Sequence, residues 1–399
     1  MLDVAIAGAG PAGIACAVAL RRRLPSLRVA VFDRAHFPRN KPCGGGLTGR
    51  ADQALQALGL SLNVRYEAAP RARVVCGGVE RTLALARPVR VIRRDEFDAS
   101  LVAQARGLGI EIFEGRPLDA FTHLGNAVEL SVAGQSLRAR ILVGADGAGS
   151  VVRKALQHER RRPIRLLRAE LPVTSQVPRD TMLYDFSAMR DGLRGYVWVF
   201  PSPGERINVG LMHDPSSPRS GAVLTQLLSR ELRRWGVDLP PHAARGWPAW
   251  GYAAGATVAA PNLLLVGDAA GIDALTGEGI AVGLEGGIVA ADAIVGGLGA
   301  GDLRFAGYRA ALRRATVGRE LAVDAWMARL IYNDAWGGWR RWLSLVLFDE
   351  KMLELYARRV CGTLILADHK PAMLSVLARH LALGRSRRRR LEAALSEVV

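Results

Sequence analysis

Three short apolar runs stand out along the chain, each followed at once by a glycine or an aspartate. Val4–Ala7, Val29–Phe32 and Leu263–Val266 have the length and composition of buried parallel strands. Between the first two runs, a glycine-rich turn at residues 8–13 leads into a helical stretch at 14–23. The N-terminus is therefore predicted to form a βαβ unit.

The rest of the chain alternates between helical and strand-like patterns. In order, we predict a helix at 51–60, strands at 72–75 and 89–92, a helix at 97–107, a strand at 110–113, hairpins at 127–143 and 195–212, and an apolar helix at 278–298. The second hairpin is assigned to a separate antiparallel sheet. Beyond about residue 303 the pattern is helical, with four tryptophans (Trp326, Trp336, Trp339, Trp342) and a basic tail, Arg385–Arg390, expected to fray. Glu285, Asp292 and several glycines interrupt the 278–298 run, which disfavours a membrane-spanning helix.

Composition and charge narrow the function classes. The 399 residues carry a formal net charge of +17, mostly from arginine, which suits an anionic cofactor, an acidic partner or an anionic lipid surface. An arginine-rich proteome would give the same balance without functional meaning. Because zinc spacings and RNA-binding motifs are missing from the sequence, no nucleic-acid partner is expected. The four cysteines form no CxxC pair and the histidines are scattered, so we expect a cytoplasmic protein without disulfides or a metal site.

The N-terminal turn has the GxGxxG spacing of a dinucleotide site. Gly8 permits the tight turn, Gly10 lets the backbone approach a pyrophosphate, and Gly13 lets helix and strand pack closely. Asp33 ends the second strand, 20 residues after Gly13, where its carboxylate can accept hydrogen bonds from an adenosine ribose. The candidate cofactor residues here are Gly8, Gly10, Ala12, Gly13, Asp33 and Arg34.

Two later segments resemble the second and third fingerprints of flavoproteins in the glutathione-reductase-like superfamily, which includes the aromatic hydroxylases. The segments are Val143–Gly147 and Leu264–Ala270, the latter followed by Thr276–Ile280. The resemblance implies bound FAD, with Asp268 holding a ribityl hydroxyl and the helix that begins near Gly279 directing its amides at the isoalloxazine ring. The candidate residues are Asp146, Gly147, Asp268, Gly277, Gly279 and Ile280. The same resemblance adds Arg94 and Gln104, although Arg94 also reads as an ordinary solvated helix start.

Two further motifs resemble the geranylgeranyl reductase family, whose members reduce isoprenoid double bonds. They are Lys41–Leu47, with sequence KPCGGGL, and Tyr196–Pro201, with the pattern YxWxFP. Tyr196, Trp198 and Phe200 share one strand face and can wall an apolar channel, or simply pack in a sheet core. Lys41, Gly45 and these three aromatic residues are the candidate substrate-binding residues. Cys43 is the candidate catalytic residue, with inert packing as the alternative.

The resemblance implies a fold of the α/β class. We expect a Rossmann-like FAD-binding domain interleaved with an antiparallel-sheet substrate domain, plus C-terminal helices. The FAD-binding domain is predicted to comprise residues 1–60, 95–155 and 256–300, the substrate domain 61–94 and 156–255, and the helical region 301–399.

Three functions remain open at this point. The first is reduction of an apolar, isoprenoid-like alkene, with NAD(P)H or an acidic ferredoxin-like protein as electron donor. The second is a flavin-dependent monooxygenase or halogenase, and the third is a non-catalytic flavin-binding protein. Ala274-Leu275 stand where the reductase family often has a proline, so the substrate can differ. The C-terminal tryptophans and arginines leave two interpretations open: peripheral contact with the inner face of the membrane, or, as the favoured alternative, a helical cap whose tryptophans are core residues, with a solvated tail.

Overall fold

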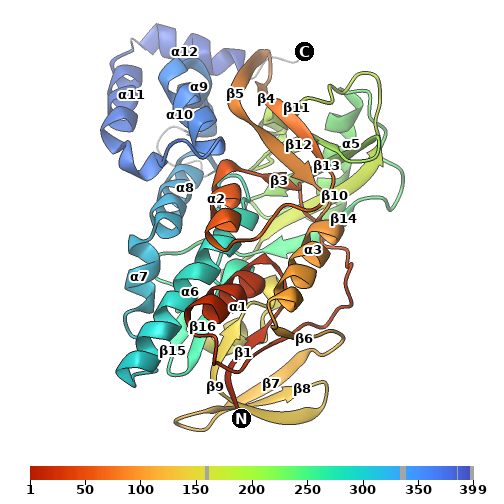
Figure 1. Ribbon diagram of the computed structural model, residues 1–399. Helices are drawn as coiled ribbons and strands as arrows, with labels where there is room; N and C mark the ends of the chain where they lie inside the picture. The colour runs from red at the N-terminus through yellow and green to blue at the C-terminus, as the bar shows by residue number, and fades with distance from the viewer. Residues whose placement is uncertain (158–160, 333–337, 384, 396–399) are drawn as a thin grey trace.

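The structure is a computed structural model that describes residues 1–157, 161–332, 338–383 and 385–395. Two eight-stranded sheets lie one above the other in Figure 1, and the C-terminal helices run along one side of both. The predicted α/β class, with a flavoprotein-like sheet, a second sheet and C-terminal helices, is confirmed.

The first sheet is built around the predicted parallel strands. Its order is β15-β16-β9-β1-β2-β6, and β7 and β8 extend it from β9. The strands are β1 (Leu2–Ala7), β2 (Val29–Phe32), β6 (Glu111–Phe113), β7 (Leu118–His123), β8 (Val128–Val132), β9 (Gln135–Gly144), β15 (Ala259–Ala260) and β16 (Leu263–Leu265). Because β1, β2, β6, β9 and β16 pair in parallel, the loops after β1, β2, β9 and β16 meet at one edge of the sheet.

The second sheet has the order β14-β10-β13-β12-β11-β4-β5-β3. The strands are β3 (Gly46–Leu47), β4 (Tyr66–Cys76), β5 (Val79–Ile92), β10 (Ile164–Pro172), β11 (Thr181–Asp185), β12 (Val197–Ser202), β13 (Arg206–His213) and β14 (Arg245–Ala249). It is antiparallel except where β4 and β11 pair in parallel. The long β4–β5 hairpin joins the two β-rich pieces seen in the sequence.

Helices pack on both sheets and close the side of the molecule. They are α1 (Pro11–Arg23), α2 (Gly49–Ala57), α3 (Arg94–Gly107), α4 (Val151–Leu156), α5 (Gly221–Arg233), α6 (Ile280–Ala300), α7 (Tyr308–Arg314), α8 (Thr316–Tyr332), α9 (Gly338–Phe348), α10 (Glu350–Val360), α11 (Lys370–Ala382) and α12 (Arg385–Ala394). Helix α6 is long and apolar enough to cross a membrane by length and composition alone. However, it packs closely on α1. A Cβ at Gly287 would lie only 2.5 Å from the carbonyl oxygen of Ala12, so the two helix backbones are nearly in contact there.

The C-terminal region is tied to the rest of the chain through backbone contact. A Cβ at Gly49, the first residue of α2, would lie 2.0 Å from the carbonyl oxygen of Cys361, and a Cβ at Gly362 would lie 2.6 Å from the carbonyl carbon of Gly49. Only glycine allows this approach. We call the pair Gly49 and Gly362 the glycine contact.

The tail and the tryptophans differ partly from expectation. Residues 385–390 begin α12 rather than fraying, because buried Leu395 anchors the helix end and its carbonyl oxygen accepts from the Cys76 thiol. Trp339 and Trp342 are buried, whereas Trp326 is 46% exposed. Trp336 lies outside the described residues.

Candidate active site

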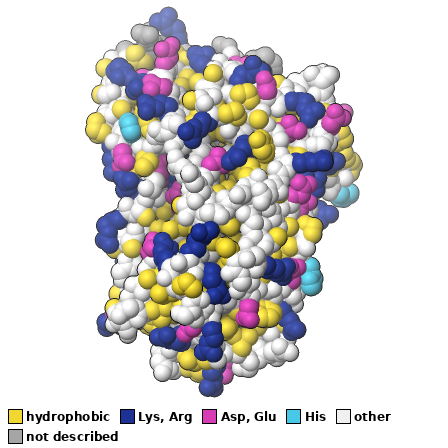
Figure 2. Space-filling view, viewed as in Figure 1, with side chains coloured by type: hydrophobic (Ala, Val, Ile, Leu, Met, Phe, Trp, Pro, Cys, Tyr) yellow, Lys and Arg dark blue, Asp and Glu magenta, His cyan; other side chains and the backbone are white. Residues whose placement is uncertain are grey.

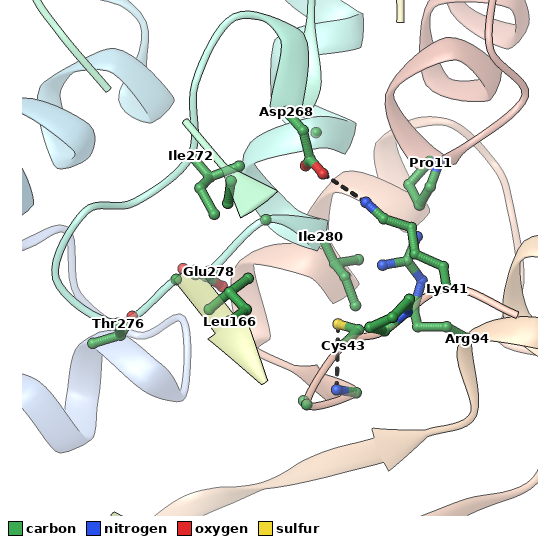
Figure 3. Close-up of a pocket in the computed structure, with 18 of the residues that line it drawn as sticks. Pro11, Lys41, Cys43, Arg94, Leu166, Asp268, Ile272, Thr276, Glu278 and Ile280 are labelled. Carbon is green, nitrogen blue, oxygen red and sulfur yellow. Dashed lines mark hydrogen bonds and ion pairs between the residues drawn. The ribbon is translucent and has the colours of Figure 1, made fainter. Parts of the chain in front are cut away.

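A cavity of about 650 Å³ lies between the two sheets and the C-terminal helices. Glycine-rich loops after the parallel strands form one end of it, and β4, β5 and helices α8 to α10 form the other. Figure 3 shows Lys41, Cys43, Asp268 and Glu278 directed into this space from different loops. Segments far apart in the sequence therefore meet here.

The GxGxxG turn brings the first two fingerprints together. Gly8 has φ +106°, and a Cβ there would lie 2.3 Å from the carbonyl oxygen of Ala145. A Cβ at Gly13 would lie 1.9 Å from the carbonyl oxygen of Gly8, so Gly13 serves the close helix–strand packing and does not itself line the cavity. Gly10 and Ala12 do line it, and the nearest atom to a Cβ at Gly10 is a guanidinium nitrogen of Arg39 at 3.4 Å.

Asp33 and Arg34 border the same end of the cavity. The Asp33 carboxylate accepts hydrogen bonds from the backbone N–H of Ala9 at 2.8 Å and of Ala35 at 2.9 Å. Each carboxylate oxygen keeps a second lone pair, which is what a ribose hydroxyl requires. Arg34 is exposed and lines the cavity beside it.

Asp146 supplies an unused acceptor. Its Oδ2 accepts from the backbone N–H of Val151 at 2.8 Å, but its buried Oδ1 has no hydrogen-bond partner among the described residues. Burial raises the pKa of this carboxyl, although Ser150 and Val151 oppose the shift. A buried polar atom without a partner is costly, so Asp146, next to Gly147 in the cavity wall, fits a hydroxyl or N–H group of a bound dinucleotide.

Asp268 pairs with Lys41. The Lys41 ammonium lies 2.5 Å from Asp268 Oδ2 and 5.7 Å from the ring centre of Trp247. Burial alone would raise the pKa of Asp268, but Lys41 and the more distant Arg94 hold it below its ordinary value. The sequence assigned Lys41 to the substrate and Asp268 to the cofactor, whereas the structure places both at one point of the cavity wall.

The loop before α6 is held rigidly. Buried Asp273 accepts from the backbone N–H groups of Leu275 at 2.6 Å and Thr276 at 3.1 Å, and the Tyr196 hydroxyl donates to the Thr276 carbonyl at 2.5 Å. Gly277, Gly279 and Ile280 line the cavity. The free N–H groups at the start of α6 therefore border the space where an anionic ring edge would lie.

Two predicted cofactor residues have different surroundings. Arg94 lines the cavity and is held by two hydrogen bonds of 2.9 Å to buried Asp98, which Arg39 also contacts at 3.1 Å. Gln104 is a correction: it lies outside the cavity lining, and its amide pairs with the backbone N–H and carbonyl of Ser61 at 2.8 and 2.9 Å. Gln104 thus ties α3 to the segment after α2.

The Cys43 loop is fastened to the second sheet. The Cys43 carbonyl accepts from Asn208 Nδ2 at 2.7 Å, and Asn208 Oδ1 accepts from the Trp198 indole at 3.0 Å. The Cys43 sulfur accepts from the backbone N–H of Gly45 at 3.4 Å. Gly45 has φ +80°, and a Cβ there would lie 2.3 Å from the carbonyl oxygen of Ile92, so this tight turn requires glycine.

The YxWxFP strand forms an aromatic wall. Tyr196, Trp198 and Phe200 are each 5% exposed, and all three line the cavity, as their shared strand face predicts. Tyr184 lies 5.0 Å from Phe200 between ring centres, and Phe186 lies 5.4 Å from Tyr196. Sequence reasoning missed Tyr184, Phe186 and Asn208. The only local signal for Asn208 was one amide between the apolar neighbours Ile207 and Val209.

Arg153 connects the second and third fingerprints. Its guanidinium donates to the Ala269 carbonyl at 2.8 Å and stacks over the Trp250 ring at 4.5 Å.

Within the part of the chain that the structure describes, no group of three or more His, Cys, Asp or Glu side chains is placed to hold a metal ion. The site is therefore built from glycine turns, single carboxylates and rings, which suits a dinucleotide with a planar ring system.

Comparisons with known proteins agree with this geometry. A family described as "FAD binding domain" matches residues 1–293. A menaquinone reductase of Mycobacterium tuberculosis is 34% identical over 312 residues, which cover 73% of this chain and 76% of that protein. A geranylgeranyl bacteriochlorophyll reductase-like protein of Thermoplasma acidophilum has a similar fold, with TM-score 0.74, 19% identity and coverage of 98% and 99%. The halogenase PltM also shares the fold, with TM-score 0.72, 15% identity and coverage of 99% and 94%.

Proposed function

Because the chain belongs to the FAD-binding-domain family of oxidoreductases, we propose that it reduces a carbon–carbon double bond of an apolar, isoprenoid-like substrate. FAD, when bound and reduced, would supply the hydride. The residues of this chain bind the substrate, orient its double bond and keep water away. Asp33, Asp146, Asp268 and the glycine loops are the residues that would hold FAD.

One observation carries this proposal: the cavity continues from the glycine loops into an apolar end. The apolar side chains that line that end are Ala72, Val74, Leu83, Leu85, Val89, Ile331, Leu343, Val346, Leu353 and Val360. They come from β4, β5, α8, α9 and α10, which flank the aromatic wall. Such a lining binds a hydrocarbon chain through the hydrophobic effect and offers little to a polar substrate.

The chemistry explains why the site is enclosed. An isolated alkene is a poor hydride acceptor, so the double bond must be held in a productive orientation with water excluded. Tyr196, Trp198 and Phe200 supply a rigid surface for it. Cys43, half-buried between this wall and the glycine loops, is our candidate for contact with the double bond, as proton donor or positioning group.

The relatives support a reductive reaction on an isoprenoid compound. The Mycobacterium tuberculosis relative is named as a menaquinone reductase. The Thermoplasma acidophilum protein is named for its likeness to a geranylgeranyl reductase. For the electron donor we propose NAD(P)H or an acidic ferredoxin-like protein. Figure 2 shows Lys and Arg side chains spread over the whole visible face, which would favour an acidic partner.

A monooxygenase or halogenase is the second candidate, because the halogenase PltM shares the fold over nearly the whole chain. Lys41 is the one lysine among the described residues that line the cavity. Its ammonium pairs with Asp268 and does not face the apolar end, which weakens the case for a halogenase. Oxygen consumption coupled to product formation would favour this candidate over reduction.

We also propose that the substrate enters from an anionic membrane surface at the inner face of the membrane. Ile331 and Val346 line both the cavity and a small crevice between α8, α9 and α11. Trp326, also in that crevice, and Leu374 on α11 are 46% and 60% exposed. Exposed Lys370 on α11 supplies charge complementary to anionic lipids.

The test is anaerobic. FAD-bound protein is reduced and mixed with polyprenyl compounds, and we expect FAD reoxidation together with a product carrying two more hydrogens. Val346→Phe narrows the apolar end and should slow this step while FAD affinity stays unchanged. Leu124→Phe, on the exposed β7–β8 turn at the opposite end of the molecule, is the matched control. Reoxidation by oxygen alone, with no hydrogenated product, would refute the proposal.

A further inference from the structure

A buried group of charged side chains lies behind the cavity wall, where α2, α6, α8 and α10 meet. Its members are Arg50, Glu278, Glu285, Glu320, Asp324 and Arg359. We call this group the buried ionic cluster. Apart from Glu278, which lies within Thr276–Ile280, none of these residues was singled out from the sequence as part of the site.

Two guanidinium groups hold the cluster together. Arg50 donates to Glu285 at 2.9 and 2.7 Å, and Arg359 donates to Glu320 at 2.6 Å and to Asp324 at 2.5 Å. Arg50 also lies 3.8 Å from Glu278 and 3.9 Å from Glu320, which joins the two pairs into one network.

The charges of the cluster do not balance. Four carboxyl groups face two guanidinium groups, and the charge of buried Asp273 also acts on Arg359 and Asp324. Glu320 and Asp324 are 0% and 1% exposed, so water cannot screen the excess negative charge. An unpaired carboxylate in such a place is strongly disfavoured, and the least costly remedy is to bind a proton.

Asp324 is the residue best placed to keep that proton. Its Oδ2 accepts from Arg359, but its buried Oδ1 has no hydrogen-bond partner among the described residues. Burial, and after it Asp273 and Glu320, raises the pKa of Asp324 well above its ordinary value, while Arg359 opposes the shift. Burial likewise raises the pKa of Glu285. The Tyr356 hydroxyl on α10 donates to the Met327 sulfur and therefore does not supply a hydrogen bond to Asp324 Oδ1.

The cluster reaches the cavity through Glu278. Glu278 and Arg359 both line the cavity, and Glu278 Oε1 accepts from the Thr48 hydroxyl at 2.5 Å. Figure 3 shows Glu278 at the edge of the cavity, on the loop that leads into α6. Arg50, 3.8 Å from Glu278, links this residue to the rest of the cluster, so Glu278 and Arg359 are the cluster members that border the substrate space.

We propose that the buried ionic cluster stores the proton consumed in the reduction and that Glu278 passes it to the substrate. This rests on the proposed function. Hydride from reduced FAD forms one new C–H bond, and the π-electron pair of the alkene forms the second with the proton. The substrate is reduced, FAD is left oxidised, and the cluster gains one negative charge until solvent returns a proton. Cys43 is then a positioning residue.

Infrared spectroscopy tests whether the buried ionic cluster holds a proton, and it needs no substrate. At neutral pH, FAD-bound protein should show the carbonyl band of a protonated carboxylic acid, which shifts in D₂O. Asp324→Asn should remove this band. Asp368→Asn is the control. It breaks only a surface ion pair with Arg319, which lies on α8 as Asp324 does, so the band should remain. Absence of the band in the parent protein would overturn the store, whatever the reaction is.

Single-turnover kinetics tests the delivery. Glu278→Gln should slow anaerobic substrate reduction by about 10²–10⁴-fold, the usual contribution of a general acid, and make the remaining rate depend on pH. Glu278→Asp should restore part of the rate. A purely structural role would lower stability but leave the pH profile and the solvent isotope effect unchanged, and that result overturns the delivery. If the band is present but no substrate is reduced, the proposed function and the delivery fail while the store stands. The Glu278 side chain keeps 13% of its surface exposed, against 1% for Asp324, so its variants keep the test available even if Asp324→Asn unfolds.

Discussion

Replacing Asn208 tests whether the Cys43 loop is held in place by the second sheet. The side chain of Asn208, on β13, is 1% exposed and bridges the Cys43 carbonyl and the Trp198 indole. Asn208→Ala leaves both groups without that partner, and each unsatisfied buried group costs about 1–3 kcal/mol. Because the Cys43 carbonyl borders the cavity, water can replace part of its loss, and we expect the free energy of unfolding to fall by about 2–4 kcal/mol.

Two further variants separate the contributions. Asn208→Asp keeps an acceptor for Trp198 but cannot donate to Cys43, so it isolates the contact with the loop. Trp198→Phe removes the other partner, and combining it with Asn208→Ala closes a double-mutant cycle. Chemical denaturation of the FAD-bound protein supplies the free energies.

The mobility of the loop has its own probe. Cys16, Cys76 and Cys361 are buried, so a water-soluble thiol reagent should react first with Cys43. A loss of about 1.4 kcal/mol in local stability raises the population of the open loop tenfold, and the reaction rate should rise accordingly. If Asn208→Ala changes unfolding by less than about 0.5 kcal/mol and leaves this rate unaltered, the loop is held by other contacts and our reasoning is wrong.

Three other perturbations address the remaining features. Asp33→Ala should weaken FAD binding by about 10–100-fold in a fluorescence titration, since it removes a ribose acceptor and loosens the Ala9 turn; unchanged affinity would contradict this placement. Despite burial, Lys41 keeps the pKa of Asp268 low, so their pairing stabilises the fold above pH of about 4 and is lost as the pH falls through the lowered pKa. Unfolding free energies should therefore drop more steeply below that pH in the parent protein than in Lys41→Met, and parallel curves would count against the pair. Leu374→Glu with Leu381→Glu should reduce co-sedimentation with anionic vesicles, whereas Leu124→Glu at the other end should not; equal binding by both variants would remove α11 as the contact.

The features that could be predicted from the sequence are those with local signals. Continuous apolar runs such as Val29–Phe32 can only be buried on both faces, and GxGxxG spacing fixes a turn within a few residues. Strand alternation predicted the shared face of Tyr196, Trp198 and Phe200, but it left open whether these rings line a channel or pack in a sheet core. In contrast, Arg50 and Arg359 act through partners more than 30 residues away, and nothing in their neighbourhood marks them. Asn208 is marked only as a single amide between apolar neighbours, which does not reveal its distant partner Cys43. Gln104 shows the opposite error, because a position carried over from a resemblance turned out to bind the backbone of Ser61.

The glycine contact limits how this protein can be re-engineered. The match to the FAD-binding family ends at residue 293, which invites grafting the last hundred residues of a relative to change the substrate. Yet Gly362 meets Gly49 backbone to backbone, and three residues earlier Arg359 reaches across to buried acids. A chimera that brings any larger residue to position 362 would wedge α10 away from α2 and open the apolar end to solvent. A chimera designed to change the substrate must therefore take the residues at positions 49 and 362 from the same parent protein.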